Sequence, residues 1–175
     1  MSQTPARPLS AEVRRPFLAM AASYVLGTFN DNFFKQAVML LAVTQGQKEL
    51  QGLAALAFTL PFVLLAAPAG WMADRFPKRT VVVGAKALET AAALVGLAGL
   101  VTGHLELMVG MVGLMGLQAP FFSPALNGSI PELPPAEEVP RVNALLRVGV
   151  STAILVGVTS AGLVLDVRGG SLLGA

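Results

Sequence analysis

The chain has 175 residues, of which 54% are hydrophobic and only 13% are charged, and its formal net charge is +2. A soluble domain usually carries about 25% charged residues, so this composition argues against a surface that faces water and indicates one that faces lipid. The sequence contains no cysteine, which excludes disulfides, thiol catalysis and thiolate metal sites.

Five apolar segments are each long enough to cross a membrane as a helix. A spanning helix needs about 20 mainly apolar residues, because the hydrocarbon core is about 30 Å thick and a helix rises about 1.5 Å per residue. The segments cover approximately residues 17–43, 50–73, 81–102, 105–125 and 144–165. Residues from 171 onward are expected to open a sixth helix that is truncated.

Other interpretations of these apolar runs fit less well. Strands of a membrane barrel need about 9–11 residues with strict alternation, and nothing in this sequence alternates. A soluble helical bundle would need a polar face on every helix, and segments 50–73 and 81–102 show almost none. Arg14 and Arg15 resemble a twin-arginine export signal, but the apolar stretch continues past Ala21 into polar residues that a signal core lacks. We therefore predict an all-α integral membrane protein.

Lysine and arginine concentrate on alternate sides of the predicted helices. The loop after the first helix has one lysine, and the loop after the third has neither lysine nor arginine. The tail and the other two loops carry Arg7, Arg14, Arg15, Arg75, Lys78, Arg79 and Arg141. By the positive-inside rule, this pattern predicts a multi-pass protein with a cytoplasmic N-terminus. The basic residues are not interleaved with aromatics in a stripe, so we expect no nucleic-acid partner.

A polar cluster interrupts the first apolar segment at Asn30, Asp31, Asn32 and Lys35. An ionised side chain at bilayer depth costs at least ~2.5–3.5 kcal/mol, so these residues should face other helices or a watery cavity. Asp31 and Lys35 are four residues apart and share one helical face. We interpret the cluster as a candidate site for a substrate or a coupling ion; the alternative is a pair that only sets helix packing.

Lys86 and Glu89 form a second candidate pair within the third segment. They are three residues apart and share a face, so Glu89 joins the candidate binding residues. The alternative is structural, because Lys86 is close enough to the helix end for its ammonium to reach the membrane interface.

The loop GWMADRFPKR at residues 70–79 resembles the signature loop of the major facilitator superfamily. Gly70, Asp74, Arg75, Lys78 and Arg79 stand in matching places, whereas the family usually has a glycine at the position of Pro77. The resemblance implies the N-terminal half of a major facilitator fold, with five transmembrane helices and the start of a sixth. It also implies that the loop locks one access state by contacting the opposite half.

Two other motifs resemble a narrower group, the lysophospholipid transporters. They are FNDNFFK at residues 29–35, and FSPA at residues 122–125 with its continuation through IPEL at 130–133 to NAL at 143–145. The motif AKALE at residues 85–89 is similar to forms fused to acyltransferase and acyl-ACP synthetase domains. Asp31 matches the acid that the group is thought to use for the headgroup or coupling ion. Leu126 replaces the basic residue that commonly follows FSPA.

This resemblance implies a secondary transporter that moves lysophospholipid, specifically lysophosphatidylethanolamine, across the bacterial inner membrane for re-acylation. The expected partners are the lipid bilayer, the lysophospholipid, a missing C-terminal transporter half, and a fused or separate acyltransferase/acyl-ACP synthetase. The chain is expected to be too short to transport alone. The alternatives are a transporter of another solute, such as a drug or organic anion, and a non-transporting membrane anchor of a fused acyltransferase.

An enzymatic function has few candidate groups in this sequence. Lipid acyltransferases like the fused domains use a histidine followed five positions later by an aspartate, but His104 is the only histidine and Val109 stands at that place. We therefore expect no catalytic residues, no metal site and no cofactor.

Overall fold

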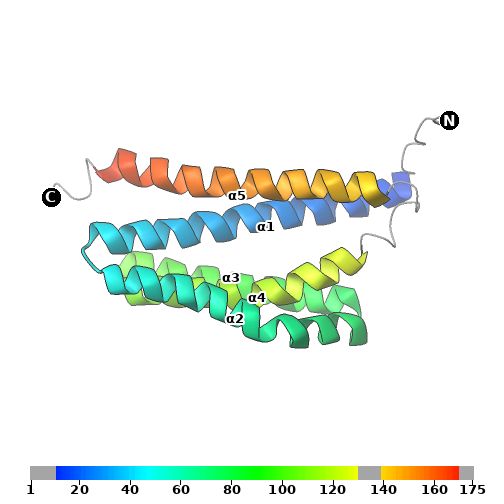
Figure 1. The fold of residues 1–175 in the computed structure, drawn as a ribbon, viewed down its shortest axis with the longest axis horizontal. Coiled ribbons are helices and arrows are strands. Elements are labelled where there is room, and N and C mark those ends of the chain that lie inside the picture. The colour runs from blue at the N-terminus through cyan, green and yellow to red at the C-terminus, as the bar shows by residue number, and fades with distance from the viewer. Residues whose placement is uncertain (1–10, 130–138, 170–175) are drawn as a thin grey trace.

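The computed structural model describes residues 11–129 and 139–169, and the regular secondary structure in these ranges is α-helical (Figure 1). The helices are α1 (Ala11–Thr44), α2 (Lys48–Arg75), α3 (Lys78–Thr102), α4 (Leu105–Ser129) and α5 (Val139–Gly169). The expected sixth helix from residue 171, Arg7 and the IPEL motif at 130–133 lie outside the described residues. The fold class predicted from the sequence, an all-α membrane protein, is confirmed.

The five helices pack in two groups that lie against each other. In Figure 1, α1 and α5 lie side by side, and α2, α3 and α4 form the second group. Helix α4 packs extensively against both α2 and α3, while α1 joins the groups through contacts with α2 and α4. Helix α4 is therefore the centre of its group, and α1 connects the two groups.

Within residues 11–129 and 139–169, four helices are long and apolar enough to cross a membrane, namely α2, α3, α4 and α5. Helix α1 does not meet the same criterion, although its 34 residues would measure about 50 Å. The reason is its central polar cluster, since Asn30, Asp31 and Asn32 are followed closely by Lys35 and Gln36. The helix expected from sequence to span the membrane first is thus also the most polar at its centre.

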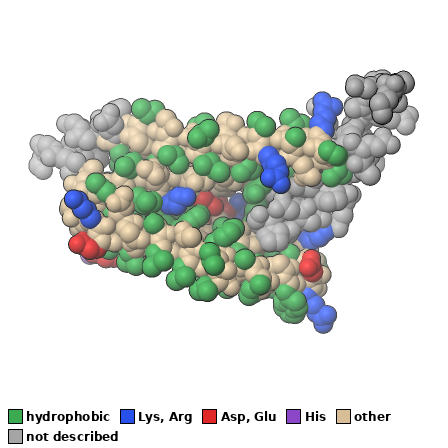
Figure 2. All heavy atoms as spheres, in the orientation of Figure 1, with side chains coloured by type: hydrophobic (Ala, Val, Ile, Leu, Met, Phe, Trp, Pro, Cys, Tyr) green, Lys and Arg blue, Asp and Glu red, His purple; other side chains and the backbone are tan. Residues whose placement is uncertain are grey.

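The long sides of the molecule are covered with apolar side chains, as a lipid-facing surface requires. Figure 2 shows hydrophobic side chains along the helices, with charged groups near both ends and a small charged group in the middle. On α3, Val101 is 77% exposed and Leu94 is 63% exposed. Exposing such large apolar side chains is unfavourable in water but not in the hydrocarbon of a membrane.

The main apolar core lies where α4 meets α1, α2 and α3. Its buried members include Val38, Ala54, Ala92, Val112 and Met115. Small residues let the helix backbones approach closely, as is usual in membrane bundles. At Gly116 of α4, an added Cβ would lie only 2.7 Å from the Cα of Phe58 on α2.

Two short turns depend on glycine. Gly46 and Gly103 have φ angles of 73° and 71°, in the left-handed region that other residues rarely adopt. The turn between α2 and α3 is different, because Pro77 has φ −54° and Phe76 is extended at φ −107°. The turn therefore accommodates proline where the superfamily usually has glycine.

Replacing Gly103 with alanine should lower the free energy of unfolding by about 1 kcal/mol, because alanine is strained at this φ. The measurement is thermal unfolding of the protein in detergent. Gly84→Ala is the matched control, since Gly84 is exposed within α3 and an added Cβ there meets nothing within 4 Å. Equal melting temperatures for the two variants would show that the turn tolerates a side chain.

Candidate functional site

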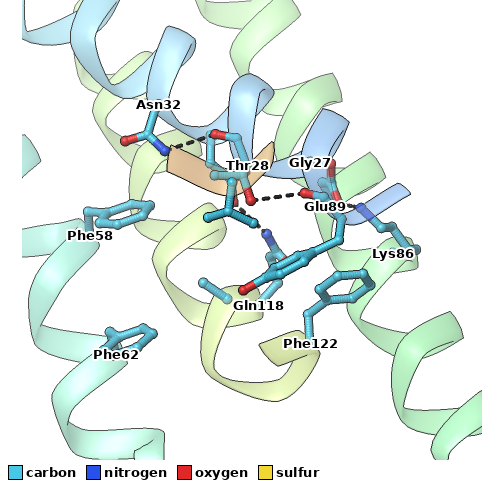
Figure 3. Close-up of a pocket in the computed structure, with 13 residues that line it drawn as sticks. Gly27, Thr28, Asn32, Phe58, Phe62, Lys86, Glu89, Gln118 and Phe122 are labelled. Atoms are coloured by element: carbon cyan, nitrogen blue, oxygen red, sulfur yellow. Dashed lines mark hydrogen bonds and ion pairs between the residues drawn. The ribbon is translucent and has the colours of Figure 1, made fainter. Parts of the chain in front are cut away.

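A cavity of about 240 Å³ lies between the helices, and its lining combines apolar side chains with several polar ones from the five described helices. Figure 3 shows Phe58 and Phe62 of α2 on one side of it, Lys86 and Glu89 of α3 on the other, and Gln118 of α4 between them. Its polar lining residues are Tyr24, Thr28, Asp31, Asn32, Lys86, Glu89 and Gln118. Polar groups at this depth in an apolar bundle indicate a path for a polar ligand or an ion.

Asp31 is the most buried charged group of the cavity, with 9% of its surface exposed. Its Oδ2 accepts a hydrogen bond of 3.1 Å from Nε2 of Gln118, which is itself buried. Its Oδ1 is buried and has no hydrogen-bond partner among the described residues. A buried carboxylate oxygen without a donor is costly, so this atom is suited to receive a donor or cation from a ligand.

The other members of the predicted helix-one cluster take different positions. Asn32 lines the cavity; its Nδ2 donates to the carbonyl of Thr28 at 2.8 Å, and its Oδ1 accepts from Lys35 Nζ at 3.1 Å. Lys35 Nζ also lies 4.5 Å from the ring centroid of Phe58. Neither Lys35 nor Asn30 is among the residues that line the cavity. The cluster therefore divides, with Asp31 and Asn32 at the cavity and Lys35 beside it.

The pair on α3 faces the same cavity. Lys86 Nζ lies 2.5 Å from Glu89 Oε2, and the side chains are 32% and 16% exposed. The ammonium also lies 4.7 Å from the ring centroid of Phe122, a favourable cation–π position. An added Cβ at Gly27 of α1 would lie 3.0 Å from Lys86 Nζ, so the pair reaches across to α1. The structure thus brings Glu89 to the same cavity as Asp31.

The sequence alone did not identify Gln118, whose side-chain amide donates a hydrogen bond to Asp31. A signal was present, because Gln118 is the only polar residue between Glu106 and Ser123 of an apolar run. Nothing local indicates its partner, since 87 positions separate it from Asp31. His104 lies in the exposed turn after α3, and residues 11–129 and 139–169 contain no group of three acidic or histidine side chains able to hold a metal.

Comparison with known families identifies the class of membrane protein to which this chain belongs. The family profile described as Major Facilitator Superfamily matches residues 17–173, nearly the whole chain. The chain belongs to the Major Facilitator Superfamily. It is accordingly a multi-pass membrane protein with the N-terminal-half fold of this superfamily.

Several curated relatives carry the name Lysophospholipid transporter LplT. The protein from Serratia proteamaculans is 29% identical over 153 residues, which cover 87% of this chain and 37% of the relative. The one from Cronobacter sakazakii is 30% identical over 161 residues, covering 91% of this chain and 39% of the relative. The chain therefore spans less than two fifths of the length of these relatives. No solved structure matches the chain.

The loop that resembles the superfamily signature is separate from the cavity. Asp74 and Arg75 end α2, Lys78 and Arg79 begin α3, and Gly70 lies half-buried one turn before Asp74. Arg79 is seven residues before Lys86, about 10 Å along α3. Asp74, Arg75 and Arg79 are exposed, and Lys78 is half-buried. The loop thus presents its charges at the end of the bundle, where another segment can meet them.

Proposed function

We propose that the complete protein containing this chain is a secondary transporter that moves lysophosphatidylethanolamine across the bacterial inner membrane for re-acylation. The observation that carries the proposal is Asp31, a buried acid that lines the cavity between the helices and whose Oδ1 has no partner among the described residues. Membership of the superfamily and the name of the relatives support it. In this proposal Asp31, Asn32 and Glu89 contact the headgroup or the coupling ion, while Asn30 and Lys35 support them from α1.

The chemistry of the cavity suits a lipid headgroup better than a uniformly apolar solute. A charged headgroup cannot cross hydrocarbon unaided, because each charge costs several kcal/mol there. The cavity offers both signs of charge, from Asp31, Glu89 and Lys86, and the amide of Gln118. Apolar side chains on the neighbouring helices can accompany the acyl chain, which needs no polar path.

The proposed arrangement of the complete protein has two halves. Residues 1–175 form the N-terminal half, and a C-terminal half completes the substrate path, because transporters of this class bind substrate at the interface of two repeats. In this arrangement Gly70, Asp74, Arg75, Lys78 and Arg79 form the conformational lock against the other half. An acyltransferase/acyl-ACP synthetase, fused or separate, re-acylates the transported lipid.

The proposed orientation has the N-terminus in the cytoplasm. The start of α1, the α2–α3 turn and the start of α5 lie at the same end of the bundle (Figure 1). The turn carries Arg75, Lys78 and Arg79, and Arg141 lies near the start of α5. This accumulation of positive charge supports placing that end at the cytoplasmic face.

The test is uptake into spheroplasts that lack their own lysophospholipid transporter. We expect the wild-type gene product to raise the initial rate of labelled lysophosphatidylethanolamine uptake well above the empty-vector rate. A small organic anion and a cationic drug serve as comparison solutes, and neither should accumulate. Transport of either solute by a well-expressed protein that ignores the lysolipid would assign the protein to another substrate class.

A further inference from the structure

A second cavity, a groove of about 380 Å³, lies between α2 and α3, with Phe121 of α4 between them. Met72 and Phe76 contribute its α2 wall, and Gly84 and Leu88 belong to its α3 wall. None of the described residues lines both this groove and the central cavity. The groove is therefore a separate site, which the proposed transport path does not use.

The groove is shaped for a single hydrocarbon chain. Its described lining is apolar except for the hydroxyl group of Thr80, and on α3 it extends from Thr80 to Leu88, about 12 Å along the helix. Helices α2 and α3 pack on α4 far more than on each other, yet only Phe76 and Pro77 separate them in the chain. The walls therefore converge toward the turn, where a helix about 10–12 Å in diameter cannot enter but an acyl chain can.

The narrow end of the groove carries a positive charge. Arg75 is the last residue of α2 and follows Met72 by three positions, so the two side chains share a face of the helix. The guanidinium is exposed and forms no ion pair within residues 11–129 and 139–169. Asp74 lies two positions from both Met72 and Phe76, so it belongs to another face and stays available to the proposed lock. A guanidinium beside an apolar groove is complementary to a phosphate that carries an acyl chain.

Aromatic side chains place this end of the groove at the membrane surface. Trp71 is 61% exposed, and its ring lies edge-on to that of Phe76 with 6.1 Å between the centroids. Exposed tryptophan is typical of the interface where lipid headgroups lie. The α2–α3 turn is also at one end of the bundle (Figure 1). Arg75 is thus at the depth of the headgroups, while Gly84 and Leu88 are at the depth of the acyl chains.

We propose that this groove binds an anionic phospholipid of the surrounding membrane, with its phosphate at Arg75 and one acyl chain along Gly84 and Leu88. The lipid is a bound component of the membrane-embedded protein and not the transported solute, because it lies outside the central cavity. A net negative headgroup is preferred, since a zwitterionic lipid brings a second positive group toward Arg75.

The first test measures which lipid lies beside Trp71. The protein is reconstituted into phosphatidylcholine vesicles that contain a fixed fraction of phosphatidylglycerol or phosphatidylcholine brominated on its acyl chains, because bromine quenches indole fluorescence. The signal of Trp71 is the difference between the wild type and Trp71→Phe. One arginine–phosphate contact predicts about fivefold preferential quenching by phosphatidylglycerol.

Two results of this first test would overturn the proposal. Equal quenching by the two lipids would mean that the groove takes acyl chains whatever their headgroup. No quenching by either lipid would mean that another protein segment covers the groove. Both results come from the wild type and Trp71→Phe, so they do not depend on changing the groove itself.

The second test removes the charge. Arg75→Gln should abolish the preference for phosphatidylglycerol, because the phosphate loses its charged donor. Arg141→Gln is the matched control, since it removes the same charge from an exposed position near the start of α5, at the same end of the bundle. It should keep the preference. A preference that survives in Arg75→Gln, or that falls equally in both variants, would show that overall charge and not this groove selects the lipid.

The third test fills the groove. An added Cβ at Gly84 meets nothing within 4 Å, so Gly84→Leu can occupy the space of the acyl chain without a backbone clash. The preference for phosphatidylglycerol at Trp71 should fall to near one. Gly110→Leu is the control, at an exposed glycine of α4 with equally open surroundings, and should keep the wild-type preference. A full preference in Gly84→Leu would place the acyl chain outside the groove and refute the proposal.

Discussion

Replacing Asp31 with alanine is expected to reduce the initial rate of lysophospholipid uptake about a hundredfold or more. Removing one partner of a buried charge pair costs ~2–5 kcal/mol, and each 1.4 kcal/mol is a factor of about ten. Folding should not suffer in the same way. The variant removes a buried oxygen that has no partner, but it also leaves Nε2 of the buried Gln118 without its acceptor, so the two effects oppose each other and the melting temperature should change little.

The control for this variant is Glu49→Ala, which removes one negative charge at the exposed start of α2, far from the cavity lining. It should keep wild-type uptake. Initial rates are normalised to the amount of each protein in the membrane, and melting temperatures are measured in detergent. If Asp31→Ala transports normally, the headgroup binds elsewhere; if it melts well below wild type, Asp31 serves the fold instead.

The fold class was readable from sequence because its causes are local. Each of α2, α3 and α5 contains an apolar run long enough to span a bilayer, and run length requires no knowledge of packing. Helix α1 was harder to interpret, because the polar cluster around Asp31 lowers its hydropathy. Its placement depends on partners from other helices, above all α5, along which it lies.

The candidate site was only partly readable for a different reason. A charged residue within an apolar run is easy to recognise in any sequence. This pattern identified Asp31 and Glu89 as candidate binding residues, and their roles remain predictions. Which groups meet is decided by packing between helices. Lys35 shares a helical face with Asp31, yet its ammonium turns to Asn32 and Phe58, because α2 approaches α1 there. The partner of Asp31 is Gln118, which no spacing rule connects to it.

A second large effect concerns the fold itself, and it is expected from Gly116→Val. A Cβ at this position would lie 2.7 Å from the Cα of Phe58 and 2.9 Å from its carbonyl carbon, closer than real Cβ atoms approach other atoms. Both obstacles are backbone atoms of α2, so no rotamer change relieves them. The variant should lose more than about 3 kcal/mol of stability and fail to accumulate in the membrane.

The loss of stability is expected to be this large because α4 lies at the centre of its group and packs on both α2 and α3. Pushing α2 away at Gly116 also opens the core around Val112 and Met115, so overpacking is followed by lost burial. Gly113→Ala is the matched control on the same helix, because its added Cβ would lie 3.6 Å from the Cβ of Ala57, an ordinary contact. Melting temperature and membrane level separate the two variants. A Gly116→Val protein as stable as Gly113→Ala would mean that α2 and α4 are farther apart at Phe58 than the structure places them.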